Sequence, residues 1–315
     1  MAVLDAVQSV FSILLMISIG YVLSLKGWFS QETPALFSRL VVKVSLPALM
    51  ISNLLTTFDR RTLLEAGIGL VLPMFVIIFL FGIGRLLSGV LKVPSDRRGV
   101  FLSLFAFSNT IFIGLPVNVA LFGEQSVSFV LLYYISNTVL FWTMGVNRIR
   151  LDGQSDYKSA SVRQTIKNFL SPPLMAFIIA VVFIMLGVEL PKFVMDTSRY
   201  IGNLTTPMSM LYVGNVIHSI RRDEIELDRE MLAVISGRFI IAPLMILGLM
   251  YFIPVPELMK KVFVVQAAMP AMTQIAIVSK AYKADHHRYA AAMITATTIA
   301  SLVFIPLYML VLSGI

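Results

Sequence analysis

The sequence predicts an all-α protein that crosses a lipid bilayer many times, and its composition decides this class. Hydrophobic residues make up 58% of the 315 residues and charged residues only 13%, and the mean hydropathy is +0.87. A soluble domain carries about 25% charged residues. The apolar residues also fall into runs of about 20, the length that spans a bilayer as a helix. We therefore expect a polytopic membrane protein.

Ten such runs follow one another and predict ten transmembrane helices. The first lacks a basic leader and is long enough to span, so we interpret it as a helix and not as a cleavable signal peptide. The ten segments are 5–25, 35–55, 63–90, 98–122, 127–147, 168–187, 198–218, 230–252, 258–282 and 288–312. A polar connection, 148–167, divides the chain into a first half, 1–147, and a second half, 168–315.

The basic residues predict how these helices are oriented. Lys and Arg are more than twice as frequent in or beside the odd-numbered connections as in or beside the even-numbered ones. The positive-inside rule then puts 148–167 in the cytoplasm and both termini outside. Because each half holds an odd number of spans, the second half must enter the membrane upside down, which gives two inverted five-helix repeats. The net charge of +8 follows largely from this bias, so we expect no nucleic-acid partner.

Helix-breaking and polar residues occur in equivalent spans of the two halves. The fourth span contains SNTIFIGLPVNVALFG (108–123), and the ninth contains AAMPAMTQIAIVSKAY (267–282). Pro116 and Pro270 lack an N–H group, and their rings crowd the preceding turn, so we expect both helices to break near mid-membrane. If the broken helices cross, the positive ends of their half-helices converge and form an anion site.

The candidate substrate-binding residues follow from this interpretation. They are Asn109, Thr110, Gly114, Pro116, Pro270, Thr273 and Gln274, with Asn53 and Lys43 as possible contributors from the second span. The alternative is that the prolines only bend their helices and that Gly114 only allows close packing. Lys43 either lines the substrate path or snorkels, and we expect Arg238 to snorkel to the cytoplasmic face. Asn137 and Asn215 are equally compatible with hydrogen bonds between helices.

Several of these stretches resemble the auxin efflux carrier family, which includes the plant PIN-type carriers and bacterial malate or malonate permeases. NTIFIGLP (109–116) is similar to that family's signature, and SRLVVKVSLPALMISNL (38–54) is similar to its second span. SPPLMAFIIAVVFIMLG (171–187) and IAIVSKAYKADHHRYAAAMI (275–294) resemble its sixth and ninth spans. The resemblance implies the fold of bile-acid and sodium–proton exchangers, with crossing broken helices 4 and 9, and elevator-type movement of organic anions.

Two features limit what this resemblance implies. The connection at 148–167 is much shorter than the long loop of the plant carriers, and Ala271 and Met272 follow Pro270 in the ninth span, which weakens the carry-over of ligand roles there. The substrate is not carried over.

The sequence also excludes most enzyme classes. It has no cysteine, three histidines, no H-E-x-x-H, no G-x-S-x-G and no nucleotide-binding loop, so we expect no enzyme activity, cofactor or metal site. No Asp or Glu falls deep in a predicted span, so no carboxylate is placed to exchange protons for substrate. We expect a secondary transporter of small carboxylates, auxin-like or dicarboxylate, working by electrogenic efflux or exchange.

Other functions stay open at this point. One alternative is a proton- or sodium-coupled carboxylate symporter, and one from another class is a transporter-like membrane receptor. We expect the protein in the cytoplasmic membrane, in contact with the lipid bilayer, with a second copy of the chain as a further candidate partner in a homodimer.

Overall fold

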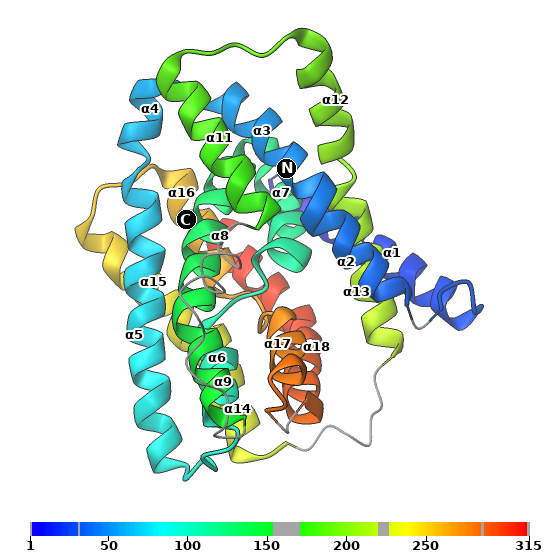
Figure 1. The fold of residues 1–315 in the computed structure, drawn as a ribbon, viewed down its shortest axis with the longest axis vertical. Helices are drawn as coiled ribbons and strands as arrows, with labels where there is room; N and C mark the ends of the chain where they lie inside the picture. The colour runs from blue at the N-terminus through cyan, green and yellow to red at the C-terminus, as the bar shows by residue number, and fades with distance from the viewer. Residues whose placement is uncertain (1, 31, 154–170, 220–226, 285–286, 314–315) are drawn as a thin grey trace.

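The computed structural model describes residues 2–30, 32–153, 171–219, 227–284 and 287–313 (Figure 1). Within these ranges every element is a helix, apart from a single isolated β-bridge between Ser108 and Ala271. This confirms the predicted all-α class. The predicted cytoplasmic connection lies outside the described residues from 154 onward.

The first half of the chain contains nine α-helices, several joined by π-helical or 3-10 turns within one span. They are α1 (Ala2–Leu25), α2 (Thr33–Leu40), η1 (Val41–Ser45), α3 (Leu46–Thr57), α4 (Arg60–Glu65), α5 (Ile68–Val90), α6 (Arg98–Ala106), η2 (Thr110–Gly114), α7 (Leu115–Phe122), η3 (Glu124–Ser126), α8 (Val127–Leu140), η4 (Phe141–Gly145) and α9 (Val146–Asp152).

The second half is also built from α-helices, with a π-helical turn inside one span. Its described elements are α11 (Pro172–Leu186), α12 (Lys192–Gly202), α13 (Thr205–His218), α14 (Arg229–Ser236), η6 (Gly237–Ile241), α15 (Ala242–Phe252), α16 (Glu257–Ala267), α17 (Gln274–Ala281) and α18 (His287–Ser313).

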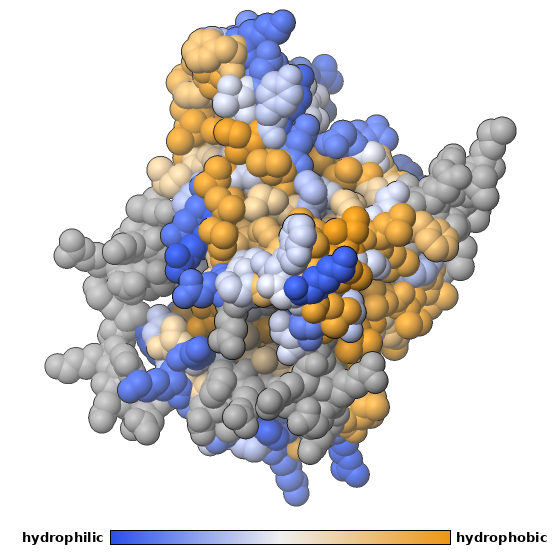
Figure 2. All heavy atoms as spheres, turned by 90° about the vertical axis from the view of Figure 1, so that its right-hand side faces the viewer, coloured by the Kyte–Doolittle hydropathy of each residue, from blue (hydrophilic) through white to orange (hydrophobic). Residues whose placement is uncertain are grey.

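Five helical stretches of the described chain are long and apolar enough to cross a bilayer alone. They are Thr33–Thr57, Arg60–Val90, Glu124–Asp152, Arg229–Phe252 and Tyr289–Tyr308. Three shorter apolar helices accompany them: Phe11–Leu25, Thr110–Phe122 and Pro172–Leu186. On the face shown in Figure 2, hydrophobic side chains form broad areas with hydrophilic patches between them. These features are those of a polytopic membrane protein.

The fifth span is longer than the sequence predicted. Helix α9 runs to Asp152, so residues 148–152 are helical and not part of the connection. The reason lies at the start of α6, where the backbone N–H of Val100 donates to the Asp152 carboxylate over 2.8 Å. A carboxylate at a helix N-terminus is favourable because it meets unpaired N–H groups and the positive end of the helix dipole.

Three prolines sit just after π-helical turns. Pro47, Pro116 and Pro243 are the second residues of α3, α7 and α15, which follow η1, η2 and η6. In each case the residue before the α segment is itself helical, so the chain passes from the wider π-helical turn into the α segment and accommodates the proline without a break. The helix therefore continues through Pro116, and the break expected there is wrong: it lies earlier, at Phe107–Asn109.

The helices pack into two groups, which we call the first group (α1, α2, η1, α3, α11, α12 and α13) and the second group (the remaining helices). In the first group α1 packs on α13, at the right of Figure 1, and α3 packs on α11 and α12. In the second group α5 packs on α6 and α8, and α15 on α16. The two broken spans both belong to the second group.

Glycine allows the closest contacts within the first group. A Cβ atom on Gly214 of α13 would lie 2.1 Å from the carbonyl oxygen of Ile17 in α1. A Cβ on Gly20 would lie 2.6 Å from the carbonyl oxygen of Leu211. The Asn215 amide then reaches across and donates to the Ser24 hydroxyl over 2.9 Å. This confirms an inter-helix hydrogen bond for Asn215 and fixes α1 against α13.

We predict that Gly214→Ala destabilises the protein by about 1–3 kcal/mol, because the added methyl group must push two backbones apart. Gly248→Ala in α15 is the matched control, since no atom lies within 4 Å of its added Cβ. The free energy of unfolding of this control should rise by up to about 1 kcal/mol, because alanine has a higher helix propensity than glycine. Thermal melting of both purified variants measures the difference. Equal melting temperatures would show that α1 and α13 are not in backbone contact.

Candidate functional site

Two broken helices meet in the middle of the second group. Helix α6 ends at Ala106 and α16 ends at Ala267, and the extended segments that follow them pair antiparallel at Ser108 and Ala271. The Asn109 N–H donates to the carbonyl of Pro270 over 2.8 Å, and the Met272 N–H donates to the carbonyl of Phe107 over 3.1 Å. We call this pairing the crossing.

A side chain from the following span holds each extended segment. Asn137 in α8 accepts from the Ser108 N–H and donates to the Ser108 carbonyl, both over 3.1 Å. Thr297 in α18 accepts from the Ala271 N–H over 3.2 Å. Both side chains are fully buried. Asn137 therefore makes the inter-helix bonds that the sequence allowed for it, and Thr297 has the same role on the other segment.

Arg238 fixes the C-terminal ends of both half-helices. Its side chain is fully buried and donates to five acceptors. They are the carbonyls of Met269 (3.1 Å), Phe105 (3.3 Å), Ala106 (2.9 Å) and Ala267 (2.6 Å), and the hydroxyl of Ser108. All five N–H groups of the guanidinium are thus used. The expectation that Arg238 snorkels to the cytoplasmic face is wrong, because these unpaired carbonyls need a buried donor.

The charges at the crossing are therefore distributed unevenly. The C-terminal ends of α6 and α16 carry partial negative charge, which the Arg238 cation neutralises. The N-terminal ends of η2 and α17 carry partial positive charge, and both face a pocket. No Asp or Glu is among the described residues that line it. The described lining thus combines the positive ends of two helical segments with no carboxylate.

The pocket lies beside the crossing and, counted together with the open space at its mouth, has a volume of about 290 Å³. It brings together four of the predicted residues, Asn109 and Thr110 from the first half of the chain and Thr273 and Gln274 from the second. The full lining consists of Val42, Leu46, Ser108, Asn109, Thr110, Ile111, Phe112, Tyr134, Met272, Thr273 and Gln274. Val42 and Leu46 belong to the first group, so the pocket lies at the boundary between the two groups.

Asn109 has an unused donor in this pocket. Its side-chain oxygen accepts from the Phe112 N–H over 3.2 Å and so caps η2. Its Nδ2 atom is buried and has no partner among the described residues. A buried amide donor without a partner costs about 1–3 kcal/mol, so a ligand that accepts from it is favoured.

Gly114 and Pro270 shape the crossing and do not line the pocket, and Pro116 lies in α7, away from both. A Cβ on Gly114 would lie 2.4 Å from Oε1 of Gln266, whose buried side chain crosses over this glycine. From there Gln266 donates to the Thr110 carbonyl over 3.3 Å. Pro270 lies in the break itself, as predicted, where its carbonyl accepts from Asn109.

The two candidates from the second span are not in the pocket. Lys43 in η1 is exposed to the surface. Asn53 accepts from the Ser128 hydroxyl over 2.9 Å and lines a different, polar pocket of about 840 Å³ with Arg199 and Glu124. The reason is distance along the helix, since Asn53 lies about two turns beyond Leu46.

Sequence reasoning missed three residues that build the site: Gln266, Thr297 and the role of Arg238. A signal existed for Arg238, because an arginine inside a span costs at least about 2.5–3.5 kcal/mol and marks a function by default. Gln266 stands four residues before Pro270, a position where an amide can approach the broken helix. Nothing in the local sequence distinguishes Thr297 from other threonines of α18.

Comparisons with known proteins place the chain in a family of membrane transport proteins. A family model described as "Membrane transport protein" matches residues 5–309. An uncharacterised transporter of Methanothermobacter thermautotrophicus is 25% identical over 99% of this chain and 100% of its own length. An uncharacterised transporter of Methanocaldococcus jannaschii is 23% identical over 92% of this chain and 94% of its own.

We predict that Arg238→Met destabilises the protein by about 3 kcal/mol or more, because it leaves buried carbonyls without a donor. Arg238→Lys should also destabilise the protein, because the ammonium group of lysine cannot replace the planar guanidinium that donates to the ends of both helices. Arg85→Lys, at an exposed position of α5, is the control and should melt like the wild type. Thermal melting in detergent measures all three. If Arg238→Met melts at the wild-type temperature, Arg238 does not stabilise the two helix ends.

Proposed function

Because the chain belongs to the membrane transport protein family, which is the auxin efflux carrier family, we propose that it carries a small organic anion across the membrane. The observation that carries this proposal is the unpaired Nδ2 donor of Asn109, buried in a pocket that faces two helix N-termini. Both features favour a ligand that brings negative charge and hydrogen-bond acceptors.

The lining favours a carboxylate with one charged group and an apolar body. No Lys, Arg or His side chain is among the described residues that line the pocket, so the donors come from amides, hydroxyls and helix ends. The rest of the lining is apolar or aromatic: Val42, Leu46, Ile111, Phe112, Tyr134 and Met272. A second carboxylate would be desolvated against these side chains without a partner, at a cost of several kcal/mol.

An architecture of ten spans in two inverted repeats would place this site between a stationary and a moving part. The two breaks, the two side chains that hold them and the antiparallel crossing support the pseudo-twofold relation. Both broken helices lie in the second group, while the pocket also touches Val42 and Leu46 of the first group. An elevator movement of the second group past the first would carry the bound anion across.

The anion should cross with its own charge. Glu230, the buried carboxylate at the start of α14, is paired with Arg97 over 2.5 Å and accepts from the Tyr289 hydroxyl over 2.7 Å. It is therefore held in a fixed ion pair and does not line the pocket. With both termini outside and the interior of the cell negative, the membrane potential drives an anion outward by about 2.3 kcal/mol per 100 mV.

We predict that Asn109→Ala weakens substrate binding by about 10- to 100-fold, the effect of losing one buried hydrogen-bond donor worth about 1–3 kcal/mol. Asn53→Ala is the matched control, because that amide lies in the other pocket. Calorimetry on the purified proteins with a panel of monocarboxylates and dicarboxylates measures both, and monocarboxylates with apolar bodies should bind best. If Asn109→Ala binds normally but melts at a much lower temperature, Asn109 is structural.

We also predict electrogenic flux, because the described lining of the pocket offers no group that exchanges protons with the substrate. Proteoliposomes with potassium and valinomycin clamp the potential at equal pH on both sides. The rate of net anion flux should follow the imposed potential. Flux that ignores the potential and follows an imposed pH gradient would instead identify proton-coupled transport or passage of the neutral acid.

A further inference from the structure

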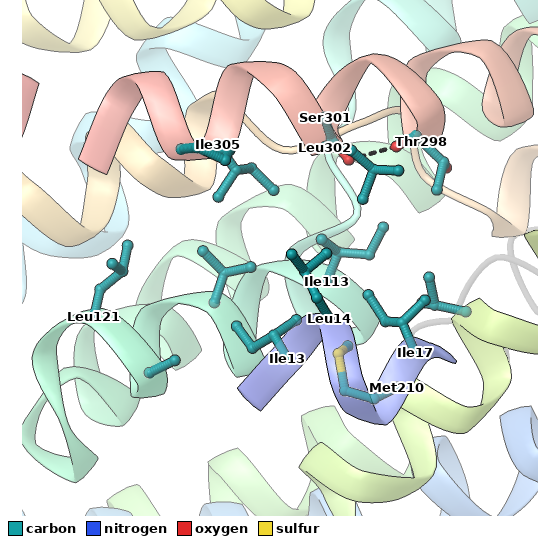
Figure 3. A pocket seen from close by; sticks show the side chains of 14 residues that line it. Ile13, Leu14, Ile17, Ile113, Leu121, Met210, Thr298, Ser301, Leu302 and Ile305 are labelled. Carbon is teal, nitrogen blue, oxygen red and sulfur yellow. Dashed lines mark hydrogen bonds between the residues drawn. The ribbon is translucent and has the colours of Figure 1, made fainter. Parts of the chain in front are cut away.

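Another cavity lies at the boundary between the two groups, and we call it the crevice. Counted together with the open space at its mouth, it has a volume of about 530 Å³. Its walls come from α1 and α13 of the first group and from η2, α7 and α18 of the second. Figure 3 shows side chains of α1, such as Ile13 and Leu14, on one side of the space and those of α18, such as Leu302 and Ile305, on the other.

The lining of the crevice is apolar. Its two hydroxyl side chains both donate within α18: Thr298 to the Ile294 carbonyl over 2.8 Å and Ser301 to the Thr298 carbonyl over 2.6 Å. The other lining residues are aliphatic, methionine or proline. A water molecule in such a space finds too few polar partners for hydrogen bonds. If the space stays empty, its lining residues lose dispersion contacts. Hydrocarbon is the ligand chemistry that fits.

The crevice is also elongated along the helices. It follows η2 and α7 from Ile113 to Leu121, and α18 from Thr298 to Pro306. Eight residues of helix rise about 12 Å. The hydrocarbon core of a bilayer is about 30 Å thick, so this length corresponds to most of one leaflet.

The rim of the crevice continues into apolar surface. Leu302 lines the crevice and is 41% exposed, and its neighbour Val303 is 71% exposed. On α1, Phe11 and Leu15 are exposed next to the lining residues Ile13 and Leu14. In a membrane-embedded protein these exposed side chains face lipid, so an acyl chain reaches the crevice without crossing polar surface.

We propose that an acyl chain of a bilayer lipid occupies this crevice and forms part of the contact between the two groups. The inference goes beyond the carried anion. It concerns the same helix, however, because Ile113 and Val117 face the crevice, whereas Asn109 to Phe112 line the anion pocket. The lipid chain contacts η2 and α7 directly after the residues that line the pocket.

Filling the crevice with protein tests this proposal. Ala120 lines the crevice from α7 and is partly buried, so Ala120→Phe places a ring where the acyl chain would lie. Adding long-chain phospholipid to detergent-solubilised wild type should raise its melting temperature, because a ligand of the folded state stabilises it. Ala120→Phe should lose most of this gain, whereas Val303→Phe, on the exposed side of α18, should keep it.

A fluorescent reporter gives a second measurement, which can be made with and without Ala120→Phe. Trp28 and Trp142 are replaced by Phe, and Leu14→Trp places a single tryptophan in the crevice. In vesicles, phosphatidylcholine with brominated acyl chains should quench this tryptophan strongly and aqueous iodide should not. Adding Ala120→Phe should reduce the quenching by the brominated lipid.

The opposite results overturn the proposal. Quenching by iodide would mean that the crevice holds water. Quenching by neither agent would mean that protein, from this chain or a second copy, covers the space. The lipid lies elsewhere on the surface if two results occur together. Lipid would then raise the melting temperatures of the wild type and Ala120→Phe equally, and adding Ala120→Phe to the Leu14→Trp reporter would leave the quenching unchanged.

Discussion

The architecture around the crossing depends on one buried guanidinium. Two helices that break inside an apolar interior leave carbonyls unpaired, and each such group costs free energy where no water can reach it. Arg238 supplies all five of its donors to the ends of α6 and α16 and to the extended segments after them. A single side chain thereby offsets the cost of both breaks and brings two distant stretches of sequence to one point.

The position of this cation also determines what the crossing can bind. Because Arg238 lies on the C-terminal ends, the negative partial charges are satisfied within the protein, and the positive ends of η2 and α17 remain directed at the pocket. The Oδ1 atom of Asn109 caps η2, which leaves its Nδ2 atom for a ligand. The preference for an anion that we propose thus rests on where the internal charges are used, and not on a lysine or arginine among the described residues that line the pocket.

The sequence predicted the helical class, the meeting of Asn109 and Thr110 with Thr273 and Gln274, and the break at Pro270, because composition and helix breakers are local signals. It misplaced the first break, since Pro116 follows a π turn that absorbs it and the pairing of Ser108 with Ala271 sets the true position. It also could not assign Arg238, Gln266 or Thr297, whose partners are more than 20 residues away. Such contacts depend on tertiary packing.

The boundary between the two groups differs physically from the packing inside them. Within the first group, Gly20 and Gly214 allow backbone contact that sliding would disrupt. At the boundary, the contacts include the apolar crevice and the rings of Phe112 and Tyr212, whose centroids are 4.7 Å apart. Apolar contacts are not directional, so one set can replace another at little cost. The hydrogen bond from Ser128 to Asn53 is directional and crosses this boundary. The proposed movement of the second group would break it, so this bond opposes such sliding while the apolar contacts permit it.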